Sequence, residues 1–474
     1  MVLKLDGKSI ADPLYGSVQL TKLESQIVSS AAFQRLHNVR QLGLGHLVFP
    51  SAAYSRFSHS VGACANADRI LSAIESNSER RFSDDERQGV RLAALLHDLG
   101  HFPFSHTTEH AMKRYVREGI YQKVDANPKQ HELKMDLPCA IQAPIFIDHE
   151  DTGKLVFNGD VEIGRAVSQS GITQELVNEV FLDPALASII SSDLDCDRLD
   201  YLRRTSLHSG APYGAVDVDF IISKATVDDE GRFCFGHKAL RATDHLLMSR
   251  FYDFMQIPYQ KTVAALEWSL EEAVIHLQRN GKIDFTRVGI EDLLTNDTWK
   301  FVDDGSLTEV LRAEHTRLFN ISDHAVVKDH LRSVLFRRPA KIVYDWDCLL
   351  DSISGEPEAK QQLLELKIDR ICETMSLDRE RFNVWRAPFK LAKAGPLLQR
   401  APSEGASHSE EEEQQLILIK EKGVGRSRPL INLPNAVSHH LAKLQYKTLR
   451  VYYLAPEGLD PGDLTRIASY LQDG

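Results

Sequence analysis

The most restrictive feature of this chain is the spacing of its apolar residues between about Leu23 and Arg332. These residues recur mostly three and four positions apart, with breaks at glycine and proline. Such spacing places apolar side chains on one face of a helix, so it predicts helices joined by loops. The clearest helices are expected over residues 84–98, 184–207, 239–257 and 261–280. The fold class is therefore predicted to be mainly α.

Two of these helices have explicit start signals. Ser83-Asp84-Asp85-Glu86 has the form of a capping box, in which the first and last side chains bond each other's backbone N–H groups. Asp183-Pro184 offers a capping carboxylate followed by proline at the first helical position. Both helices carry candidate site residues.

The two ends of the chain differ from this helical part. Alternation from Val2 to Ile10 around Asp6-Gly7 predicts a hairpin, followed by a turn at residues 12–16. Residues 141–170, rich in proline, glycine and aspartate, are interpreted as a loop or short-strand insertion.

The C-terminal part is expected to be a small mixed α/β appendage. Residues 340–346, 416–420 and 448–454 are β-branched or aromatic runs, and a helix is expected from about Asp460. Residues 396–415 contain an acidic run and are expected to be a solvated loop. We therefore predict a helical core with an N-terminal hairpin over residues 1–335 and an α/β region over residues 336–474.

Composition restricts the cellular locations and the classes of partner that we expect for this protein. The 474 residues suffice for a core without disulfides, and the six cysteines stand singly, as small core residues would. No apolar run approaches the roughly 20 residues of a membrane helix, and the N-terminus lacks a signal-peptide pattern. These features predict a cytoplasmic protein with no membrane partner. A net charge of −11 disfavours nucleic acid as a partner without excluding it.

Histidines gather in one part of the sequence. Six of the 19 lie between His59 and His131, and His97-Asp98 stands at the end of the helix expected over 84–98. Adjacent helical residues diverge by about 100°, so both side chains reach one metal ion only near a helix end. Gly100 supplies that end. Most His-Asp pairs are surface or capping pairs, so further residues are needed to support a metal site.

Two further segments supply such residues. His59 lies in the segment 56–62, and Asp197 lies in a carboxylate-rich segment of an otherwise apolar helix. Buried carboxylates are unfavourable unless a cation neutralises them. Helical spacing places positions 193, 197, 201, 205 and 208 on one face, which offers Asp197 as a ligand and Tyr201 as a neighbour of the substrate. A solvated acidic stripe is the alternative interpretation.

Taken together, the motifs resemble those of the HD-domain phosphohydrolases, specifically their deoxynucleoside triphosphate triphosphohydrolase branch. The resemblance is strong over residues 5–280, and the C-terminal part matches only in general layout. The matching segments occur in family order, and they are residues 33–36, 41–43, 48–52, 56–60, 97–106, 131–132 and 197–202.

The resemblance implies an HD-domain helical core and a set of chemical roles. His59, His97, Asp98 and Asp197 are expected to hold one divalent metal ion, for which Mn, Fe, Mg and Zn stay open. His106 with Glu109 is expected to transfer protons, although the family usually has aspartate at position 109. His131 is expected to contact the leaving phosphate chain, and His101 is expected either to be structural or to contact phosphate.

The resemblance also implies a substrate site. Gln41 and Leu42 are expected beside the sugar, with Tyr201 packed against it. The residues expected to meet the triphosphate are Arg56, Arg198, Arg250 and Lys261.

Some positions depart from the family pattern. Thr205 stands where an aspartate reads the sugar, while Leu207, Pro258 and Gln260 replace two aromatic residues and a histidine. Ser29 and His37 replace an aspartate that reads a guanine effector and a common arginine. The metal and phosphate half of the site therefore matches the family, and the sugar, base and effector half is altered.

The predicted reaction is metal-dependent attack of water on the α-phosphorus of a nucleoside triphosphate, which releases nucleoside and tripolyphosphate. The altered positions leave open a phosphomonoesterase, a phosphodiesterase or a single-strand nuclease with another nucleotide substrate. A non-catalytic nucleotide-sensing scaffold is a third hypothesis. The resemblance also implies a homo-oligomer and leaves a nucleotide effector open.

Overall fold

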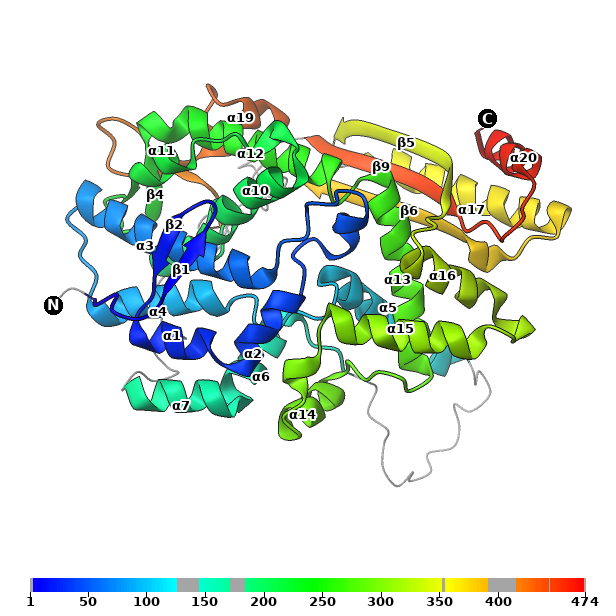
Figure 1. Ribbon diagram of the computed structural model, residues 1–474. Helices are drawn as coiled ribbons and strands as arrows, with labels where there is room; N and C mark the ends of the chain where they lie inside the picture. Colours follow the sequence, from blue (N-terminus) through cyan, green and yellow to red (C-terminus); the bar gives the residue numbers. More distant parts are fainter. Residues whose placement is uncertain are drawn as a thin grey trace, which may run out of the picture.

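Helix α3 (Arg56–Asn77) is the central element of the helical part, and it packs against α4 (Asp84–Leu96) and α10 (Cys196–Ser209). In this computed structural model the described residues are 3–125, 145–170, 184–351, 354–390, 415–442 and 444–472. The fold is mainly α-helical with a few small sheets (Figure 1), which confirms the predicted fold class.

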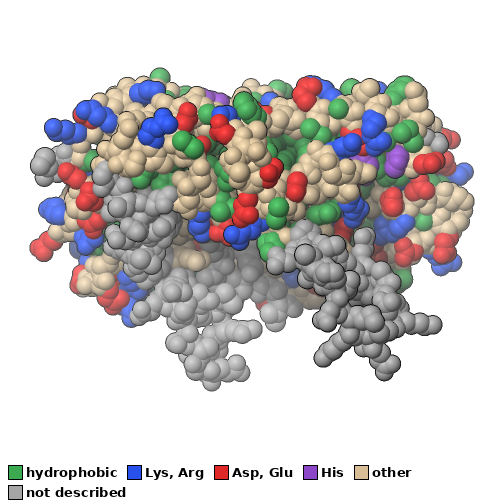
Figure 2. Space-filling view, turned by 90° about the horizontal axis from the view of Figure 1, so that it is seen from below, with side chains coloured by type: hydrophobic (Ala, Val, Ile, Leu, Met, Phe, Trp, Pro, Cys, Tyr) green, Lys and Arg blue, Asp and Glu red, His purple; other side chains and the backbone are tan. Residues whose placement is uncertain are grey.

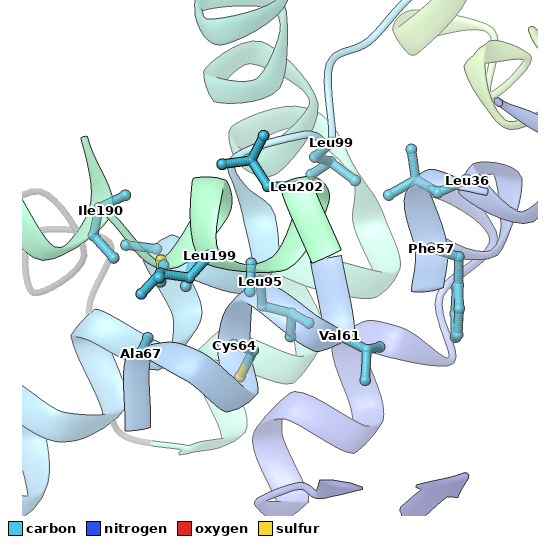
Figure 3. Packing of buried hydrophobic residues seen from close by; sticks show 14 of the residues in the cluster. Leu36, Phe57, Val61, Cys64, Ala67, Leu95, Leu99, Ile190, Leu199 and Leu202 are labelled. Carbon is cyan, nitrogen blue, oxygen red and sulfur yellow. The ribbon is translucent and has the colours of Figure 1, made fainter. Parts of the chain in front are cut away.

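The three central helices enclose a buried apolar layer. Val61 and Cys64 of α3 face Leu95 of α4, while Leu199 and Leu202 of α10 lie over them (Figure 3). All five side chains are at most 2% exposed. Burial of this kind stabilises by about 25 cal/mol per Å² of apolar surface, so this layer holds in place the helix ends that carry the candidate ligands.

Capping explains where the helices around this layer begin. The Ser83 side chain accepts a hydrogen bond from the Glu86 N–H, and the Glu86 side chain accepts one from the Ser83 N–H. The capping box and the helix expected over 84–98 are therefore confirmed. The helices expected over 239–257 and 261–280 are also confirmed, as α12 (Leu240–Gln256) and α13 (Lys261–Arg279).

The single helix expected over residues 184–207 is wrong. The structure has α9 (Pro184–Ile190) and then α10, with a break between them. The Asp195 side chain accepts hydrogen bonds from the N–H groups of Ser192 and Arg198, both at 2.8 Å. Aspartate at this position starts a new helix rather than continuing the old one. Asp193 therefore lies in the break and does not share a helical face with Asp197. Asp183 lies outside the described residues.

The loop or short-strand interpretation of residues 141–170 is also wrong for its described part. Residues 149–170 form α6 (His149–Gly159) and α7 (Val161–Ser170), and residues 141–144 lie outside the described ranges. Asp148 caps α6 through the N–H of Asp151, and Asp160 accepts a hydrogen bond from the N–H of Ile163. The polar residues that suggested loops are caps between short helices.

The N-terminal hairpin lies further along the chain than predicted. Strands β1 (Ser9–Asp12) and β2 (Gly16–Gln19) pair antiparallel, so the turn expected at residues 12–16 is the turn of the hairpin itself. Asp12 accepts hydrogen bonds from the N–H groups of Leu14 and Tyr15, and Gly16 adopts a φ of +70°. The other described α-helices are α1 (Lys22–Val28), α2 (Ala31–Gln34), α5 (His106–Asp125), α11 (Val218–Ser223), α14 (Arg287–Thr295), α15 (Asp304–Leu318) and α16 (Ala325–Leu335).

A three-stranded antiparallel sheet dominates the C-terminal part. Strands β5 (Lys341–Asp351), β9 (Leu444–Tyr453) and β6 (Phe382–Lys390) pair in that order, and α17 (Glu356–Met375) and α20 (Pro461–Gln472) pack against the sheet (Figure 1). The strands expected over 340–346 and 448–454 and the helix expected from Asp460 are confirmed. Neither α17 nor β6 was predicted.

A second sheet joins this region to the helical part. Strands β3 (Ala225–Val227), β4 (Phe233–Gly236), β7 (Leu418–Lys420) and β8 (Ser427–Pro429) pair in that order, with β7 parallel to β4. The strand expected at 416–420 is confirmed, and it is followed by α19 (Val437–Leu441). Residues around β7 belong to the main apolar cluster. The division at residue 335 stays a prediction, and the acidic loop at 396–415 lies outside the described residues except for Gln415.

The described surface and cysteines complete this picture. Within the described ranges, no helix combines the length and the apolar composition that crossing a bilayer requires. In the face shown in Figure 2, acidic and basic side chains are intermixed. Four cysteines are buried and Cys348 is partly exposed, while Cys139 lies outside the described residues.

Asp228 should control how firmly β7 and β8 hold to the helical part. Ser427 donates its N–H and hydroxyl to this carboxylate, and Arg232 donates two guanidinium N–H groups. Burial opposes ionisation, but these bonds outweigh it and lower the pKa of Asp228 from 3.8 to about 2. A lowered folded-state pKa stabilises the fold above the unfolded value and loses that contribution as pH falls towards 2.

We therefore expect Asp228→Asn to lower the free energy of unfolding by about 1–3 kcal/mol at pH 7. The difference from wild type should shrink as pH falls below about 4. Chemical denaturation at pH 7, 5 and 3.5 checks both statements. A difference that stays constant with pH would contradict the role assigned to the ionised carboxylate.

Candidate functional site

The structure brings the four predicted metal ligands together from three helices. His59 lies on α3, Asp197 lies in the first turn of α10, and His97 and Asp98 follow the last residue of α4. His59 Nε2 lies 2.8 Å from Asp197 Oδ1 and 3.7 Å from Asp98 Oδ2. His97 Nε2 lies 3.4 Å from Asp98 Oδ1 and 3.8 Å from Asp197 Oδ1.

The two imidazole rings are oriented by their other nitrogen atoms. His97 is the C-terminal cap of α4, and its Nδ1 donates to the carbonyl of Ala94 at 2.8 Å. His59 Nδ1 lies 2.7 Å from Asp200 Oδ2. Hydrogen bonds to acceptors at Nδ1 favour the tautomer whose Nε2 carries a lone pair. Asp200 thus has a role that sequence reasoning missed, although it stands three residues after Asp197.

The donor set fits a metal ion. The Nε2 atoms of His59 and His97 are both buried, and each lies within 4 Å of the carboxylates of Asp98 and Asp197. Burial lowers the pKa of His59, but Asp197 and Asp200 outweigh it and raise the pKa to about 10. The pocket therefore attracts positive charge. Two imidazoles and two carboxylates form a typical ligand set for a divalent transition metal.

A buried chain of charges supports His59 from behind. Asp200 accepts two hydrogen bonds from Arg204, at 2.9 and 2.8 Å, and Arg204 also donates to Asp12 at 2.9 Å. The side chains of Asp200 and Arg204 are fully buried. Gly62 makes this approach of α10 to α3 possible, because a Cβ atom there would lie 1.9 Å from Asp200 Oδ1. The first helix of the pair therefore needs glycine at this position.

Arg56 is placed as a support for Asp98. Its Nη1 donates to Asp98 Oδ2 at 2.6 Å and its Nε donates to Ser105 Oγ at 2.8 Å, and the residue is 1% exposed. Burial raises the pKa of Asp98, but Arg56 and the neighbouring histidines hold it well below its ordinary value. The predicted contact of Arg56 with phosphate stays a prediction. What the structure shows is a guanidinium that keeps a candidate ligand ionised.

Three of the candidate ligands, His97, Asp98 and Asp197, line a cleft of about 1720 Å³. Arg198 and Arg250 line it and are both held by Asp193 Oδ1, at 2.9 and 3.5 Å. Lys261 does not belong to the cleft lining, and its ammonium pairs with Asp345. Among the predicted substrate residues, those that line the cleft are Gln41, Leu42, Arg56, Arg198, Tyr201 and Arg250.

The predicted proton-transfer pair lies at the start of α5 beside the ligands. His106 Nδ1 lies 3.3 Å from Glu109 Oε2, and Lys113 donates to the other oxygen at 2.5 Å. Burial raises the pKa of Glu109, but His106, His149 and Lys113 outweigh it and place the pKa far below its ordinary value. His149 Nδ1 lies 3.0 Å from Glu109 Oε2. His131 lies outside the described residues.

Sequence reasoning missed His149 because its segment was interpreted as a loop insertion. The N-terminus of α6 packs directly on the turn after Asp98. A Cβ atom on Gly100 would lie 2.1 Å from the Gly153 nitrogen and 2.2 Å from the His149 carbonyl oxygen. The glycine pair was the available signal, because glycine on both elements indicates close contact between their backbones.

The wall across the cleft comes from segments distant in sequence. Glu267, Trp268 and Glu271 of α13 line it, together with Trp385 and Arg386 of β6. Burial raises the pKa of Glu267 to about 8, and the neighbouring Glu271 adds to the shift. Part of this wall is therefore uncharged near neutral pH. No sequence motif marked these residues, since their position depends on how the C-terminal sheet docks.

Thr205, which replaces the sugar-reading aspartate of the family pattern, is hydrogen-bonded to a neighbouring residue. Thr205 Oγ1 lies 2.7 Å from the Tyr54 hydroxyl, and both side chains are buried. Thr205 is therefore already engaged where the resembling family has a sugar-reading aspartate. Leu207 is 53% exposed, so this other departure from the pattern does not fill a packed position.

Residues 56–136 match the sequence profile of the HD domain. Over 319 residues the chain is 30% identical to uncharacterized protein MJ1154 of Methanocaldococcus jannaschii, a match that covers 67% of this chain and 57% of that protein. It is 28% identical to uncharacterized protein YwfO of Bacillus subtilis, over 55% of this chain and 53% of that protein. The chain thus spans little more than half the length of these relatives.

A shorter match concerns a protein of stated activity. Deoxynucleoside triphosphate triphosphohydrolase SAMHD1 of Homo sapiens is 42% identical over 100 residues, which are 21% of this chain and 16% of that enzyme. The similarity to this branch thus extends over about 100 residues.

Two solved structures share the overall fold. A hypothetical protein from Aquifex aeolicus superposes with a TM-score of 0.65 at 23% identity, over 98% of this chain and the whole of that one. A phosphohydrolase from Bacteroides thetaiotaomicron gives 0.67 at 21% identity, over 94% of this chain and 99% of that one. The chain therefore carries an HD domain within a fold that extends over nearly its full length.

Substitution of Gly62 by alanine should separate α3 from α10. The new Cβ atom would collide with Asp200 and Arg204, and overpacking of this kind typically lowers the free energy of unfolding by about 1–3 kcal/mol. Gly164→Ala in α7 is the matched control, because nothing lies within 4 Å of its Cβ position. Thermal unfolding compares the two variants. Equal stability of Gly62→Ala and wild type would contradict the tight approach.

Asp200→Asn should weaken metal binding without removing a candidate ligand. Loss of the carboxylate behind His59 removes the charge that orients the ring, and changes of this kind lower metal affinity by about 10–100-fold. Equilibrium dialysis against Mn²⁺ measures the dissociation constant, and Asp219→Asn, whose side chain is 63% exposed, is the control. An unchanged affinity for Asp200→Asn would show that the ring is held by other contacts.

Proposed function

We propose that this chain is a metal-dependent phosphohydrolase that converts nucleoside triphosphates to nucleoside and tripolyphosphate. The observation that carries the proposal is the convergence of His59, His97, Asp98 and Asp197, with both imidazole Nε2 atoms buried beside the carboxylates and the last three residues lining a large cleft. The similarity to SAMHD1 over 100 residues supports a nucleotide as substrate. The cleft exceeds the volume of most small-molecule pockets and can hold a nucleoside with a phosphate chain.

The four ligand residues would hold one divalent ion. Such an ion, when bound, polarises a phosphoryl oxygen and neutralises charge that develops on it. Arg198 and Arg250 add positive charge at the same cleft, and Asp193 fixes the position of both guanidinium groups. Guanidinium groups bind phosphate oxygens through paired N–H donors. These arginines therefore suit the phosphate chain of the substrate.

Proton transfer is assigned to His106. Its Nδ1 faces Glu109, which leaves Nε2 as the atom that exchanges a proton with water or with the leaving oxygen. A carboxylate at Nδ1 fixes the tautomer and the orientation of the ring. The His106 side chain is 56% exposed at the cleft, so a bound substrate can reach it.

The residues expected to recognise the sugar differ from those of the resembling family. Thr205 is bonded to Tyr54 and cannot read a sugar hydroxyl as an ionised aspartate would. The sugar must therefore be recognised by other residues, of which Gln41 and Tyr201 line the cleft. A homo-oligomeric state and a cytoplasmic location stay predictions, and the need for a nucleotide effector stays open.

Product analysis tests the proposal directly. The protein is loaded in turn with Mn²⁺, Mg²⁺, Fe²⁺ or Co²⁺ and incubated with each canonical dNTP and NTP, and tripolyphosphate, pyrophosphate and orthophosphate are resolved. The proposal expects nucleoside and tripolyphosphate in equal amounts. Orthophosphate alone would indicate a phosphomonoesterase and would contradict the α-phosphorus as the point of attack. No turnover with any metal or nucleotide mixture would contradict the substrate class.

Asp197→Asn should abolish most of this activity. The substitution preserves shape but removes one of two carboxylate ligands, and we expect turnover to fall at least about 100-fold, which corresponds to ~2.7 kcal/mol. Asp219→Asn is again the control, since its carboxylate is exposed and paired with Arg69. The variants are compared at saturating metal after circular dichroism has shown equal helix content. Wild-type turnover in folded Asp197→Asn would contradict the proposed centre.

A further inference from the structure

A second cluster of metal-binding side chains lies beside the first. His101, His106, Glu109 and His149 each offer one ligand atom, and these four atoms lie within 4.8 Å of one another. None of the four belongs to the proposed centre of His59, His97, Asp98 and Asp197. They come from the turn after α4, the first turn of α5 and the start of α6. Three separate chain segments therefore converge on one point.

The separations within the cluster match those between ligands of one ion. His149 Nδ1 and His106 Nδ1 lie 3.0 and 3.3 Å from the same oxygen, Glu109 Oε2. Ligands bound tetrahedrally at about 2.0–2.1 Å lie roughly 3.3 Å from one another. Lys113 bonds Oε1, the other oxygen of the carboxylate, and so leaves Oε2 to the histidines.

His101 adds an independent indication of a ligand. This side chain is 1% exposed, and its Nδ1 is buried with no hydrogen-bond partner. Its Nε2 lies 3.1 Å from Asp98 Oδ1, which favours the tautomer with hydrogen on Nε2 and a lone pair on Nδ1. The ring also stacks on His149, with centroids 4.0 Å apart, so the two rings must tilt before one ion lies in the plane of both. A buried lone pair without a donor is unfavourable, and a metal ion would satisfy it.

The backbone around the cluster is held in place. Gly100 packs against Gly153 and the His149 carbonyl so closely that no side chain fits between them. Phe104 and Ser105, which precede His106, have φ values of 55° and 56°, a conformation that non-glycine residues rarely adopt. Strained backbone of this kind persists only where surrounding structure enforces it, often at functional sites. The backbone that carries the ligand residues is therefore held in place before any ion arrives.

We propose that His101, His106, Glu109 and His149 bind a second metal ion, and that this ion inhibits the enzyme. Three imidazoles and one carboxylate favour Zn²⁺, Co²⁺ or Ni²⁺ over Mg²⁺, which prefers oxygen ligands. An ion bound to His106 Nδ1 and Glu109 removes the hydrogen-bonded pair from proton transfer. The binding of the ion stands on the cluster alone, whereas the inhibition rests on the proposed function.

The number of bound ions tests the site without reference to activity. Chelator-treated protein is dialysed against Zn²⁺ at pH 7.5, and zinc per chain is measured by atomic emission. We expect two ions in the wild type and one in His149→Ala. His110→Ala is the matched control, because His110 lies one turn from His106 on α5, is 64% exposed and is not part of the cluster. It should retain two ions.

Several results would overturn the site. One ion per wild-type chain that folded His149→Ala retains excludes it, and two ions in folded His149→Ala place the second ion elsewhere. Circular dichroism establishes whether each variant is folded. Glu109→Gln, which preserves side-chain volume, serves as a second variant with the same expected loss of one ion. Retention of both ions by Glu109→Gln would exclude Glu109 Oε2 as a ligand and overturn the assignment.

Activity separates the inhibition from the binding. Zinc is added to Mn²⁺-loaded protein during nucleotide hydrolysis, and the concentration that halves the rate is compared between wild type and His149→Ala, each relative to its own zinc-free rate. We expect this concentration to rise by about 10-fold or more in the variant. Equal values would overturn the inhibitory role. Should nucleotides not be hydrolysed, the proposed function fails while the ion counts still decide the site.

Discussion

The buried contact between His59 and Asp200 is the interaction on which the candidate centre depends. It joins α3 to α10 and directs His59 Nε2 towards Asp98 and Asp197. A buried carboxylate of this kind is unfavourable alone, and Arg204 neutralises it while Asp12 holds Arg204 in place. The N-terminal hairpin thereby contributes to the centre without touching it. The same buried contact therefore packs the two helices together and neutralises the charges between them.

Sequence predicted the parts of the structure that local patterns encode. The capped helix before His97, the helix that carries Arg250 and strands β5 and β9 of the C-terminal sheet follow from periodicity and capping. The four candidate ligands were recognised because their motifs are contiguous or lie in known order. Errors arose where polar residues had two interpretations: aspartates that suggested a continuous helix or a loop are caps at Asp195, Asp148 and Asp160.

The rest could not be predicted because it depends on contacts between distant segments. His149 reaches Glu109 only because Gly100 and Gly153 bring α6 onto the turn after α4. Lys261 was expected at the phosphate chain, but docking of β5 engages it with Asp345 instead. The order of the motifs predicts which residues lie in the same segment. It predicts little about which residue from a distant segment pairs with a given charged side chain. The proximity of two clusters of potential ligands is likewise a property of the assembled helices.

The docking of β6 across the cleft has a consequence for how this architecture diversifies. The residues proposed for chemistry lie before position 200, whereas Trp385 and Arg386 belong to a strand nearly two hundred residues later. Substitutions in that strand change the shape of one side of the cleft, while the helices that position the histidines keep their packing. One wall of the cleft and the proposed metal centre thus belong to separate segments of the chain. A lineage built on this plan can exchange its substrate and retain its chemistry.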